Sequence, residues 1–191
     1  MAIKKLNHDV IIDAAVKLVE AKGYDHFSLR ELASRLEVQP ASLYNHVKGL
    51  EEIHEEVAIR AAEMMHEVLA EAVSEKEDDT AFIDGVYGYR CFTEEHPELY
   101  KALIHIPPHD DEQIRKASFY SFQPLREIVK RYGLERSIKV HFMRTLRSFI
   151  HGFAELSGNG LMQRSPVSKE ESFDFAVHQF LLYLKENRHH E

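Results

Sequence analysis

The sequence predicts an all-α protein with a small N-terminal head and a larger C-terminal helical bundle. Glycine and proline are sparse, with eight and six residues, and the prolines fall between segments whose apolar residues recur at helical spacing. With 191 residues and 44% hydrophobic content, the chain can bury a small domain plus a larger one. We therefore expect a three-helix head at residues 1–50 and a body of about six helices at residues 51–191.

The first helix of the head is predicted to end at Lys22. Asn7 or Asp9 can cap its start, and Gly23 is a stop signal at its end. One side of this helix is apolar, and we expect it to brace the two helices that follow. The residues on that side are Ile11, Ala14, Ala15, Leu18 and Val19.

The second helix begins with two local signals. Ser28 and Glu31 have the spacing of a capping box, in which each side chain satisfies a backbone N–H of the other residue. Phe27, just before the cap, can pack on the helix as a hydrophobic staple. The apolar stripe expected to be buried consists of Leu29, Leu32, Ala33 and Leu36.

A third helix is expected at residues 40–46, because Pro40 suits a first helical position. Two helices joined by a few residues form a helix-turn-helix, whose second helix enters the major groove of DNA. On this stretch alone, the alternative is an ordinary corner between two helices with a solvated face. The residues expected to meet base edges and phosphates are Ser28, Arg30, Gln39, Pro40, Ala41, Ser42, Tyr44, Asn45, His46 and Lys48.

Charge is unevenly distributed along the chain, whose net charge is −8. Residues 1–50 hold seven Lys/Arg and six Asp/Glu, a net charge of +1, so the acidic excess lies in the body. A DNA-binding head is usually basic, and the small positive charge predicts that two heads must act together. The candidates for phosphate contacts are Lys4, Lys5, Lys17, Arg30, Arg35 and Lys48.

The body is predicted to be a series of helices separated by polar or proline-containing breaks. A long helix at residues 51–73 precedes the charged stretch at residues 74–80, which we interpret as a solvated break. A turn is expected at residues 106–111, and Pro124 should kink or interrupt the helix that follows, which Gly133 ends. The other body helices are expected at residues 81–95, 98–105, 111–132, 137–156 and 169–185.

The last two of these helices carry more apolar surface than one protomer's core can use. The helix at residues 137–156 is apolar almost all round, and the helix at residues 169–185 has two apolar stripes. Such a helix is either deeply buried or part of an interface, and pairing with a second copy would give a four-helix seam. The residues expected at this seam are Phe149, Phe153, Phe173, Val177, Phe180 and Leu184.

The middle of the body is rich in aromatic residues, since seven of the eleven phenylalanines lie at residues 82–153. Aromatic residues at helical spacing fit a plain core, but bulky rings with a few polar groups also suit a small-molecule site. Both interpretations stay open. The candidate pocket residues are Tyr89, Phe92, Leu103, Phe119, Phe122, Phe142, Phe149 and His151.

Residues 10–53 resemble the DNA-binding domain of the tetracycline-repressor (TetR) family. The resemblance departs from the family pattern at Glu37, where a turn glycine is usual, and at Leu50, where a second lysine is usual. Glu37 would need a left-handed backbone, at a cost of about 1 kcal/mol. The residues that carry the resemblance are Gly23, Tyr24, Phe27, Ser28, Leu32, Ala33, Val38, Leu43, Tyr44, His46, Val47 and Lys48.

The resemblance implies a homodimeric transcriptional regulator, most often a repressor, that binds a palindromic operator and is released by a small apolar or aromatic effector. Residues 147–156 also resemble the His-Gly signature of one C-terminal subclass of the family. That subclass takes part of its name from a tryptophan, and this chain has none. The alternative is a DNA-binding helical regulator without a small ligand, controlled by a protein partner.

Enzyme and metal alternatives have weaker patterns. Two Glu-x-x-His units in the helix at residues 51–73 match helical di-iron proteins, but such sites draw their pairs from two facing helices. Thirteen histidines could hold a regulatory metal, yet they form no close Cys/His cluster. Cys91 and His96 would lie on different faces of one helix, which disfavours a nucleophilic site. We expect no catalysis and no metal or other cofactor.

The chain shows no membrane or export signal. No apolar run approaches the ~20 residues of a membrane span, and the first residues lack the apolar core of a signal peptide. The one cysteine, Cys91, excludes an internal disulfide and fits a reducing compartment. We therefore expect a cytoplasmic protein without a membrane partner.

Overall fold

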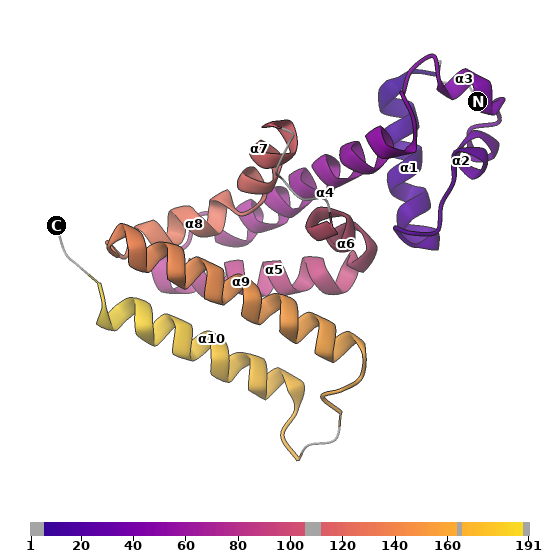
Figure 1. Cartoon of the computed structure of the whole chain (residues 1–191). Helices are drawn as coiled ribbons and strands as arrows, with labels where there is room; N and C mark the ends of the chain where they lie inside the picture. Colours follow the sequence, from indigo (N-terminus) through magenta and orange to yellow (C-terminus); the bar gives the residue numbers. More distant parts are fainter. Residues whose placement is uncertain (1–5, 106–111, 164–165, 189–191) are drawn as a thin grey trace. The chain divides into compact units, whose positions relative to one another are not determined.

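The structure, a computed structural model, describes residues 6–105, 112–163 and 166–188, and every regular element in these ranges is a helix (Figure 1). The predicted all-α fold class is therefore confirmed. The helices of the described ranges are α1 (His8–Lys22), α2 (Leu29–Arg35), α3 (Pro40–Leu43), α4 (Leu50–Val73), α5 (Asp78–Glu95), α6 (Pro97–His105), α7 (Glu112–Ser121), α8 (Gln123–Lys130), α9 (Arg136–Gly158) and α10 (Lys169–Glu186).

The chain folds into two compact units. The first comprises Met1–Met64 and His96–Tyr120, and the second comprises Met65–Glu95 and Ser121–Glu191. Helix α4 is continuous and contributes residues to both units. This is a geometric division, and the functional division expected at residue 50 remains a prediction.

In the first unit, α1 has the start and the end that its sequence predicts. The side chain of Asn7 accepts a hydrogen bond from the Val10 N–H at 2.9 Å, and the chain leaves the helix at Gly23 with a φ of 100°. Such a φ favours glycine because a Cβ atom would clash with the backbone. The predicted apolar side is buried, and its residues are Ile11, Ala14, Ala15, Leu18 and Val19.

In the second unit, α5 packs against α8, α9 and α10. Gly85 permits a close approach, because a Cβ atom there would lie 3.0 Å from the side chains of both Leu125 and Val73. An alanine would therefore force the neighbouring side chains apart. The buried side of α5 includes Phe82, Val86, Tyr89 and Phe92.

Helix α5 begins at Asp78, three residues before the predicted start, so the break after α4 is shorter than expected. Polar partners from other elements of the same unit stabilise this first turn. Asp78 pairs with Arg131 at 3.4 Å and with Arg188 at 2.9 Å. Asp79 accepts hydrogen bonds from the Tyr132 hydroxyl and the Lys185 ammonium group, each at 2.8 Å. We call these six residues the Asp78–Asp79 clamp.

The helix predicted at residues 111–132 is interrupted, as Pro124 indicated. Helix α7 ends at Ser121, and α8 starts at Gln123 with the proline in its first turn. Helix α8 ends earlier than expected, at Lys130, and the chain then reaches Gly133, whose φ is 69°. The turn predicted at residues 106–111 lies outside the described residues.

Helices α9 and α10 lie side by side and contact each other (Figure 1). Both agree with the predicted spans to within two residues, at Arg136–Gly158 and Lys169–Glu186. Helix α10 starts with a second capping box, in which Ser168 accepts the Glu171 N–H at 3.1 Å and Glu171 accepts the Ser168 N–H at 2.8 Å. This box stabilises the start of α10 by satisfying its free N–H groups.

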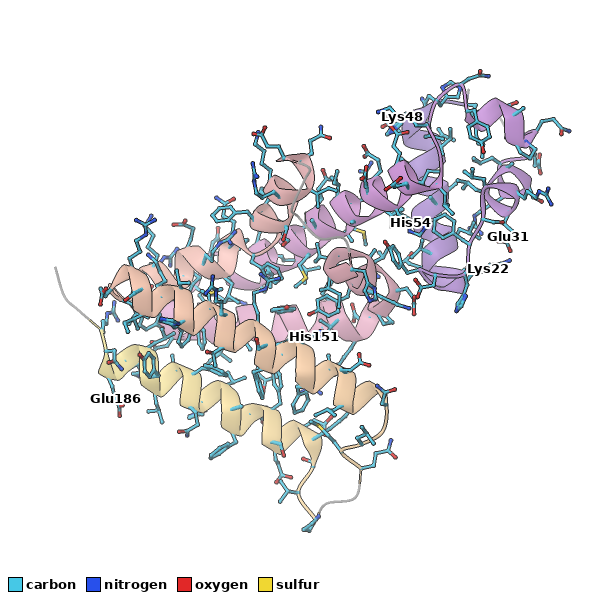
Figure 2. All side chains as sticks on the ribbon, viewed as in Figure 1. Lys22, Glu31, Lys48, His54, His151 and Glu186 are labelled. Atoms are coloured by element: carbon cyan, nitrogen blue, oxygen red, sulfur yellow. The ribbon has the colours of Figure 1, made fainter. Side chains whose placement is uncertain are left out.

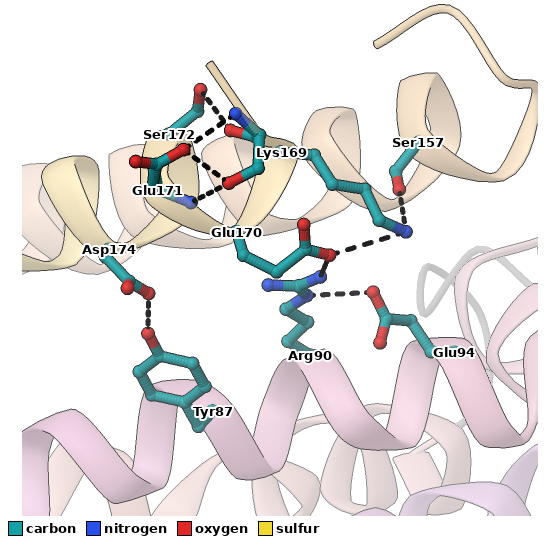
Figure 3. A network of polar contacts seen from close by, with 10 residues as sticks. Tyr87, Arg90, Glu94, Ser157, Lys169, Glu170, Glu171, Ser172 and Asp174 are labelled. Carbon is teal, nitrogen blue, oxygen red and sulfur yellow. Dashed lines mark hydrogen bonds and ion pairs between the residues drawn. The ribbon is translucent and has the colours of Figure 1, made fainter. Parts of the chain in front are cut away.

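Arg90 of α5 is a buried cation that joins α5 to α10 (Figure 3). Its guanidinium group pairs with Glu94 at 2.8 Å and with Glu170 at 3.5 Å. The same group lies over two rings, 4.6 Å from the centroid of Phe173 and 5.2 Å from that of Phe153. The charge is therefore both paired and stacked, which makes its burial tolerable.

Candidate functional site

The head presents a short helix after a tight turn, but α3 ends at Leu43 rather than at the predicted His46. The N–H groups of Ser42 and His46 bond to carbonyl groups three residues back, at Gln39 and Leu43, with N···O distances of 2.9 Å each. This spacing is tighter than that of an α-helix, so residues 44–46 form a hydrogen-bonded turn. Leu43 and Val47 are buried and anchor the segment.

Helix α2 has the cap and the buried centre that its sequence predicts. The hydroxyl of Ser28 accepts the Glu31 N–H at 3.3 Å, and the Glu31 carboxylate accepts the Ser28 N–H at 3.1 Å. Phe27, Leu32 and Ala33 are buried. The two end residues of the predicted stripe, Leu29 and Leu36, are only half-buried.

The turn between α2 and α3 contains the left-handed residue that the sequence indicated. Glu37 has a φ of 56°, and the next residue, Val38, donates its N–H to the Ala33 carbonyl at 3.0 Å. Glycine reaches this conformation without a steric penalty, whereas glutamate does not. The turn is therefore held by the bonds and packing around it, despite its local strain.

Glu37→Gly should raise the free energy of unfolding by a few tenths of a kcal/mol to about 1 kcal/mol, because relief of strain outweighs the extra freedom of the unfolded chain. Urea unfolding followed by circular dichroism measures the change. The matched control is Glu67→Gly, at an exposed position within α4, which should lower stability by about 1 kcal/mol. A destabilising Glu37→Gly would contradict the strain assigned to the turn.

The predicted DNA-binding residues are mostly exposed around α3. Tyr44 is 58% exposed, so its ring and hydroxyl are open to solvent. Pro40, Ser42 and Ser28 are half-buried, and the Ser28 hydroxyl also donates to the Glu31 carboxylate at 3.0 Å. The exposed members of the predicted set are Arg30, Gln39, Ala41, Tyr44, Asn45, His46 and Lys48.

Several cations of the head remain available for phosphates. Lys22 is not one of them, because it forms an ion pair with Glu31 (Figure 2). Lys4 and Lys5, which were also predicted to contact phosphates, lie outside the described residues. Among the described residues of the head, the Lys and Arg side chains that are exposed and form no ion pair are those of Lys17, Arg30, Arg35 and Lys48.

Helix α6 is joined to the head, within the first unit, by polar contacts that the sequence did not reveal. The Glu98 carboxylate accepts the Tyr24 N–H at 2.7 Å, and Lys101 forms an ion pair with Asp25. These partners are separated by more than 70 residues in sequence, so local patterns carry no signal for them. The contacts fix the loop after α1, which precedes the capping box of α2.

His54 of α4 packs against the same loop. Its ring centroid lies 4.6 Å from that of Tyr24 and 4.9 Å from that of Phe27. Burial lowers the pKa of His54, and the negative charge of Asp25 opposes this shift only in part. The folded protein therefore favours the neutral imidazole.

Stability should fall as the pH is lowered through the ordinary histidine value of 6.5, because the unfolded chain binds a proton at His54 before the folded chain does. His54→Leu should reduce this slope, whereas His46→Asn, which keeps His54, should retain it. Urea midpoints measured between pH 7.5 and pH 5.5 report the slopes. An equal slope in the wild type and in His54→Leu would contradict the assignment.

The predicted pocket residues are divided between the two units and differ in burial. In the second unit, Phe122 packs on Tyr89 in the core, with ring centroids 5.0 Å apart, whereas His151 is exposed. Leu103 and Phe119 belong to the first unit, and Phe119 is 63% exposed. The role of these residues in ligand binding remains a prediction.

A groove of about 530 Å³ runs between α9 and α10. It is mainly aromatic, and the exposed Phe175 and Tyr183 stand on its α10 side. The predicted pocket residues Phe142 and Phe149 lie in this groove instead of in a shared cavity with Tyr89. The lining residues are Ile138, His141, Phe142, Thr145, Phe149, Phe175, Ala176, Gln179, Phe180 and Tyr183.

Most of the residues predicted at the dimer seam are covered by their own chain. Phe153, Phe173, Val177 and Leu184 are buried in the second unit, so they cannot supply exposed surface to a partner. Phe149 and Phe180 are half-buried and line the groove. The apolar side chains of α9 and α10 that are exposed belong to another stripe, made of Val140, Leu156, Phe175, Leu182 and Tyr183.

The described residues provide no support for a metal or nucleophilic centre. No group of three or more His, Cys, Asp or Glu side chains in these ranges could hold a metal ion. Loss of solvation and the neighbouring Glu95 raise the pKa of Cys91, which is the opposite of what a nucleophilic thiol needs. None of the described helices combines the length and apolar character that a membrane span requires.

Comparison with known proteins places this architecture in a family. Residues 11–57 match the family described as "Bacterial regulatory proteins, tetR family", and residues 82–180 match "Tetracyclin repressor-like, C-terminal domain". The HTH-type transcriptional regulator YobS of Bacillus subtilis is 30% identical over 181 residues, which cover 92% of this chain and 91% of YobS.

Two further proteins are similar to this chain. The biofilm operon icaADBC HTH-type negative transcriptional regulator IcaR of Staphylococcus epidermidis is 32% identical over 81 residues, 42% of each chain. The TetR family protein ActR from Streptomyces coelicolor, in complex with actinorhodin, has the same fold, with a TM-score of 0.68, 18% identity and coverage of 98% of this chain and 100% of ActR. Because the family matches cover the head and most of the body, the protein is a member of the TetR family of DNA-binding transcriptional regulators.

Proposed function

We propose that this regulator is a homodimeric repressor that binds a palindromic operator and is released from it by a small-molecule effector. Residues 1–50 would bind the operator, and residues 51–191 would bind the effector and form the dimer. The observation that carries the proposal is the exposed polar surface around α3, held in place by the buried Leu43 and Val47.

The chemistry of this surface suits double-stranded DNA. Gln39 and Asn45 carry amide groups that can read base edges, and the exposed Tyr44 hydroxyl and Lys48 ammonium group can bind phosphates. Lys48 lies just before α4, and its backbone N–H donates to the Glu52 carboxylate, which fixes the main chain there. Two such heads would occupy successive major grooves about 34–36 Å apart.

Repression and effector control are supported by the named activities of similar proteins. IcaR is named as a negative regulator, and ActR has been crystallised with actinorhodin. In this chain, α4 belongs to both compact units and would connect an effector-dependent change in the second unit to the head. An effector acts in this way only if it binds the released state more tightly than the operator-bound state.

Tyr44→Phe and Lys48→Ala should each weaken binding of the operator and of unrelated DNA, because both residues are assigned to phosphates. Loss of Lys48 should also flatten the plot of log K against log salt concentration by about one unit per head. Gln39→Ala should instead change which operator sequence is preferred. Gel-shift titration with the promoter region beside the protein's own gene, at several salt concentrations, measures these effects.

The matched control for Lys48→Ala is Lys116→Ala. Lys116 is an exposed lysine of α7 that forms an ion pair with Glu112 at 2.7 Å. Its loss should leave both operator affinity and the salt slope unchanged. If all three changes in the head left affinity, preference and salt dependence as in the wild type, the proposed DNA-binding face would be wrong.

A further inference from the structure

One exposed face of α9 carries a polar stripe with opposite charges toward its two ends. The residues of this stripe recur at alternating intervals of four and three positions, which places them on one face of a helix. Arg144 lies in the N-terminal half of α9, and Glu155 is the last residue of the stripe. The polar stripe, whose members are all exposed, consists of Ser137, His141, Arg144, Ser148, His151 and Glu155.

Arg144 and Glu155 are not neutralised by their own protomer. None of the ion pairs among the described residues includes either side chain, and the Glu155 carboxylate accepts a hydrogen bond from the neutral Asn159 amide at 3.0 Å. From Arg144 to Glu155 the helix makes about three turns, so the two residues share a face but lie ~16 Å apart along its axis. They are therefore too far apart to pair with each other within one helix.

Small residues occupy the stretch between the two charges. Ser148 is exposed, and Gly152 is half-buried. A Cβ atom built at Gly152 would meet no side chain and no other helix of the described protomer within 4 Å. Glycine destabilises the interior of a helix, and packing within the protomer gives no steric reason for it here. Small side chains at this place suit the close approach of a second helix.

The polar stripe borders apolar surface that the protomer leaves uncovered. Leu156 follows Glu155 on α9 and is exposed, as are Phe175 and Tyr183 on the neighbouring α10. Phe149, which follows Ser148, lines the aromatic groove between the two helices. Charged residues beside exposed apolar side chains on packed helices are typical of a helical interface, in which the charges set the choice and orientation of the partner.

We propose that α9 packs antiparallel on α9 of a second copy, with Arg144 of each protomer paired to Glu155 of the other. A two-fold axis midway between these residues exchanges the two ends of the polar stripe, so both pairs form at once. In the same register, Ser148 meets His151 of the partner protomer. The inference rests on the proposed homodimer and specifies its orientation and register.

The charges act on orientation more than on the strength of association. An exposed ion pair contributes little to affinity, so truncation of one partner removes little. A parallel arrangement of the two α9 helices would instead place Arg144 beside Arg144 and Glu155 beside Glu155. Such like-charge contacts are repulsive, which disfavours the wrong arrangement. Reversal of a charge is therefore a sharper test than its removal.

Sedimentation equilibrium of charge-reversed variants at about 50 mM salt tests the proposal. Arg144→Glu and Glu155→Arg should each raise the dissociation constant of the dimer about tenfold or more, because each creates two repulsive pairs per dimer. An equimolar mixture of the two variants should associate about as tightly as the wild type, because both pairs of the mixed dimer are attractive. Native mass spectrometry identifies the mixed dimer by its mass.

Two controls separate the pairing from a general effect of charge. Arg115→Glu, at an exposed position of α7, changes the net charge as Arg144→Glu does and should leave the dissociation constant unchanged. Glu155→Arg makes this acidic protein less negative, so general repulsion predicts tighter association, whereas the pairing predicts weaker association. Both reversed positions are exposed, and circular dichroism checks that the variants fold. The double variant Arg144→Glu/Glu155→Arg should dimerise like the wild type.

The outcomes distinguish this inference from the proposed function. Wild-type affinity in both single variants, or a mixture that associates no more tightly than either variant alone, would overturn the antiparallel pairing and leave the homodimer proposal intact. A wild-type protein that stays monomeric at the concentrations at which it binds operator DNA would refute the homodimer itself, and the pairing with it.

Discussion

If the proposed homodimer pairs through the exposed stripe of α9 and α10, Phe175→Arg should give a helical monomer that no longer binds a palindromic operator. Phe175 is 68% exposed and lines the groove between α9 and α10. Replacing its ring should therefore reduce the folding stability of a single protomer only slightly. In a two-fold seam, each substitution is present twice and places two charges in an apolar contact. An unpaired buried charge costs several kcal/mol, enough to weaken self-association more than a hundredfold.

Sedimentation, circular dichroism and a gel shift together measure this effect. The matched control is Leu161→Arg, because Leu161 is 71% exposed but lies after α9 and outside the groove lining. It should leave both the dimer and operator binding unchanged. A lasting seam should also bury at least about 1,200–2,000 Å² in total. A Phe175→Arg protein that sediments as an unaltered dimer would exclude this face as the seam.

Arg90→Ala should lower the free energy of unfolding by about 2–4 kcal/mol. The substitution removes the contacts of one guanidinium group with Phe153 and Phe173 and its pairs with Glu94 and Glu170. It also leaves a cavity beneath α10 that the packed rings cannot fill. Urea unfolding measures the loss, and α10 should be the helix most affected.

Arg90→Lys separates the role of charge from that of shape. Lysine keeps the charge but lacks the planar guanidinium group that stacks on rings and pairs with two carboxylates. Arg90→Lys should therefore restore less than half of the unfolding free energy that Arg90→Ala removes. Arg144→Ala, at an exposed position of α9, is the control and should change stability by less than about 0.5 kcal/mol. A loss at Arg90→Ala no larger than that of the control would show that the stacked charge adds no net stability.

Local signals were sufficient for most helix boundaries. The cap at Asn7, the capping box at Ser28 and Glu31, and the interruption near Pro124 all depend on residues within four positions of one another, and all are confirmed. The left-handed backbone of Glu37 was predicted from the family resemblance, because a turn glycine is usual at that position. These features follow from backbone sterics and hydrogen bonding, which the sequence shows directly.

The start of α5 and the burial of the α10 side chains could not be predicted, because they depend on contacts between residues far apart in the sequence. The charged start of α5 looked like a break, because the partners that stabilise Asp78 and Asp79 are more than 50 residues away in sequence. Helical periodicity showed two apolar stripes on α10 but not which of them the protomer covers, so Phe173 and Leu184 were assigned to the seam although they are core residues. The exposure of most of the predicted DNA-binding residues around α3 agrees with their polar character, and their role in DNA binding remains a prediction.

The Asp78–Asp79 clamp connects three helix ends of the second unit. Its two adjacent carboxylates bind Arg131 and Tyr132, directly after α8, and also Lys185 and Arg188, at the end of α10. The clamp therefore joins the start of α5 to the ends of α8 and α10. A displacement of the end of α8 would strain these contacts at the start of α5 and at the end of α10, the helix whose exposed stripe would face a second protomer.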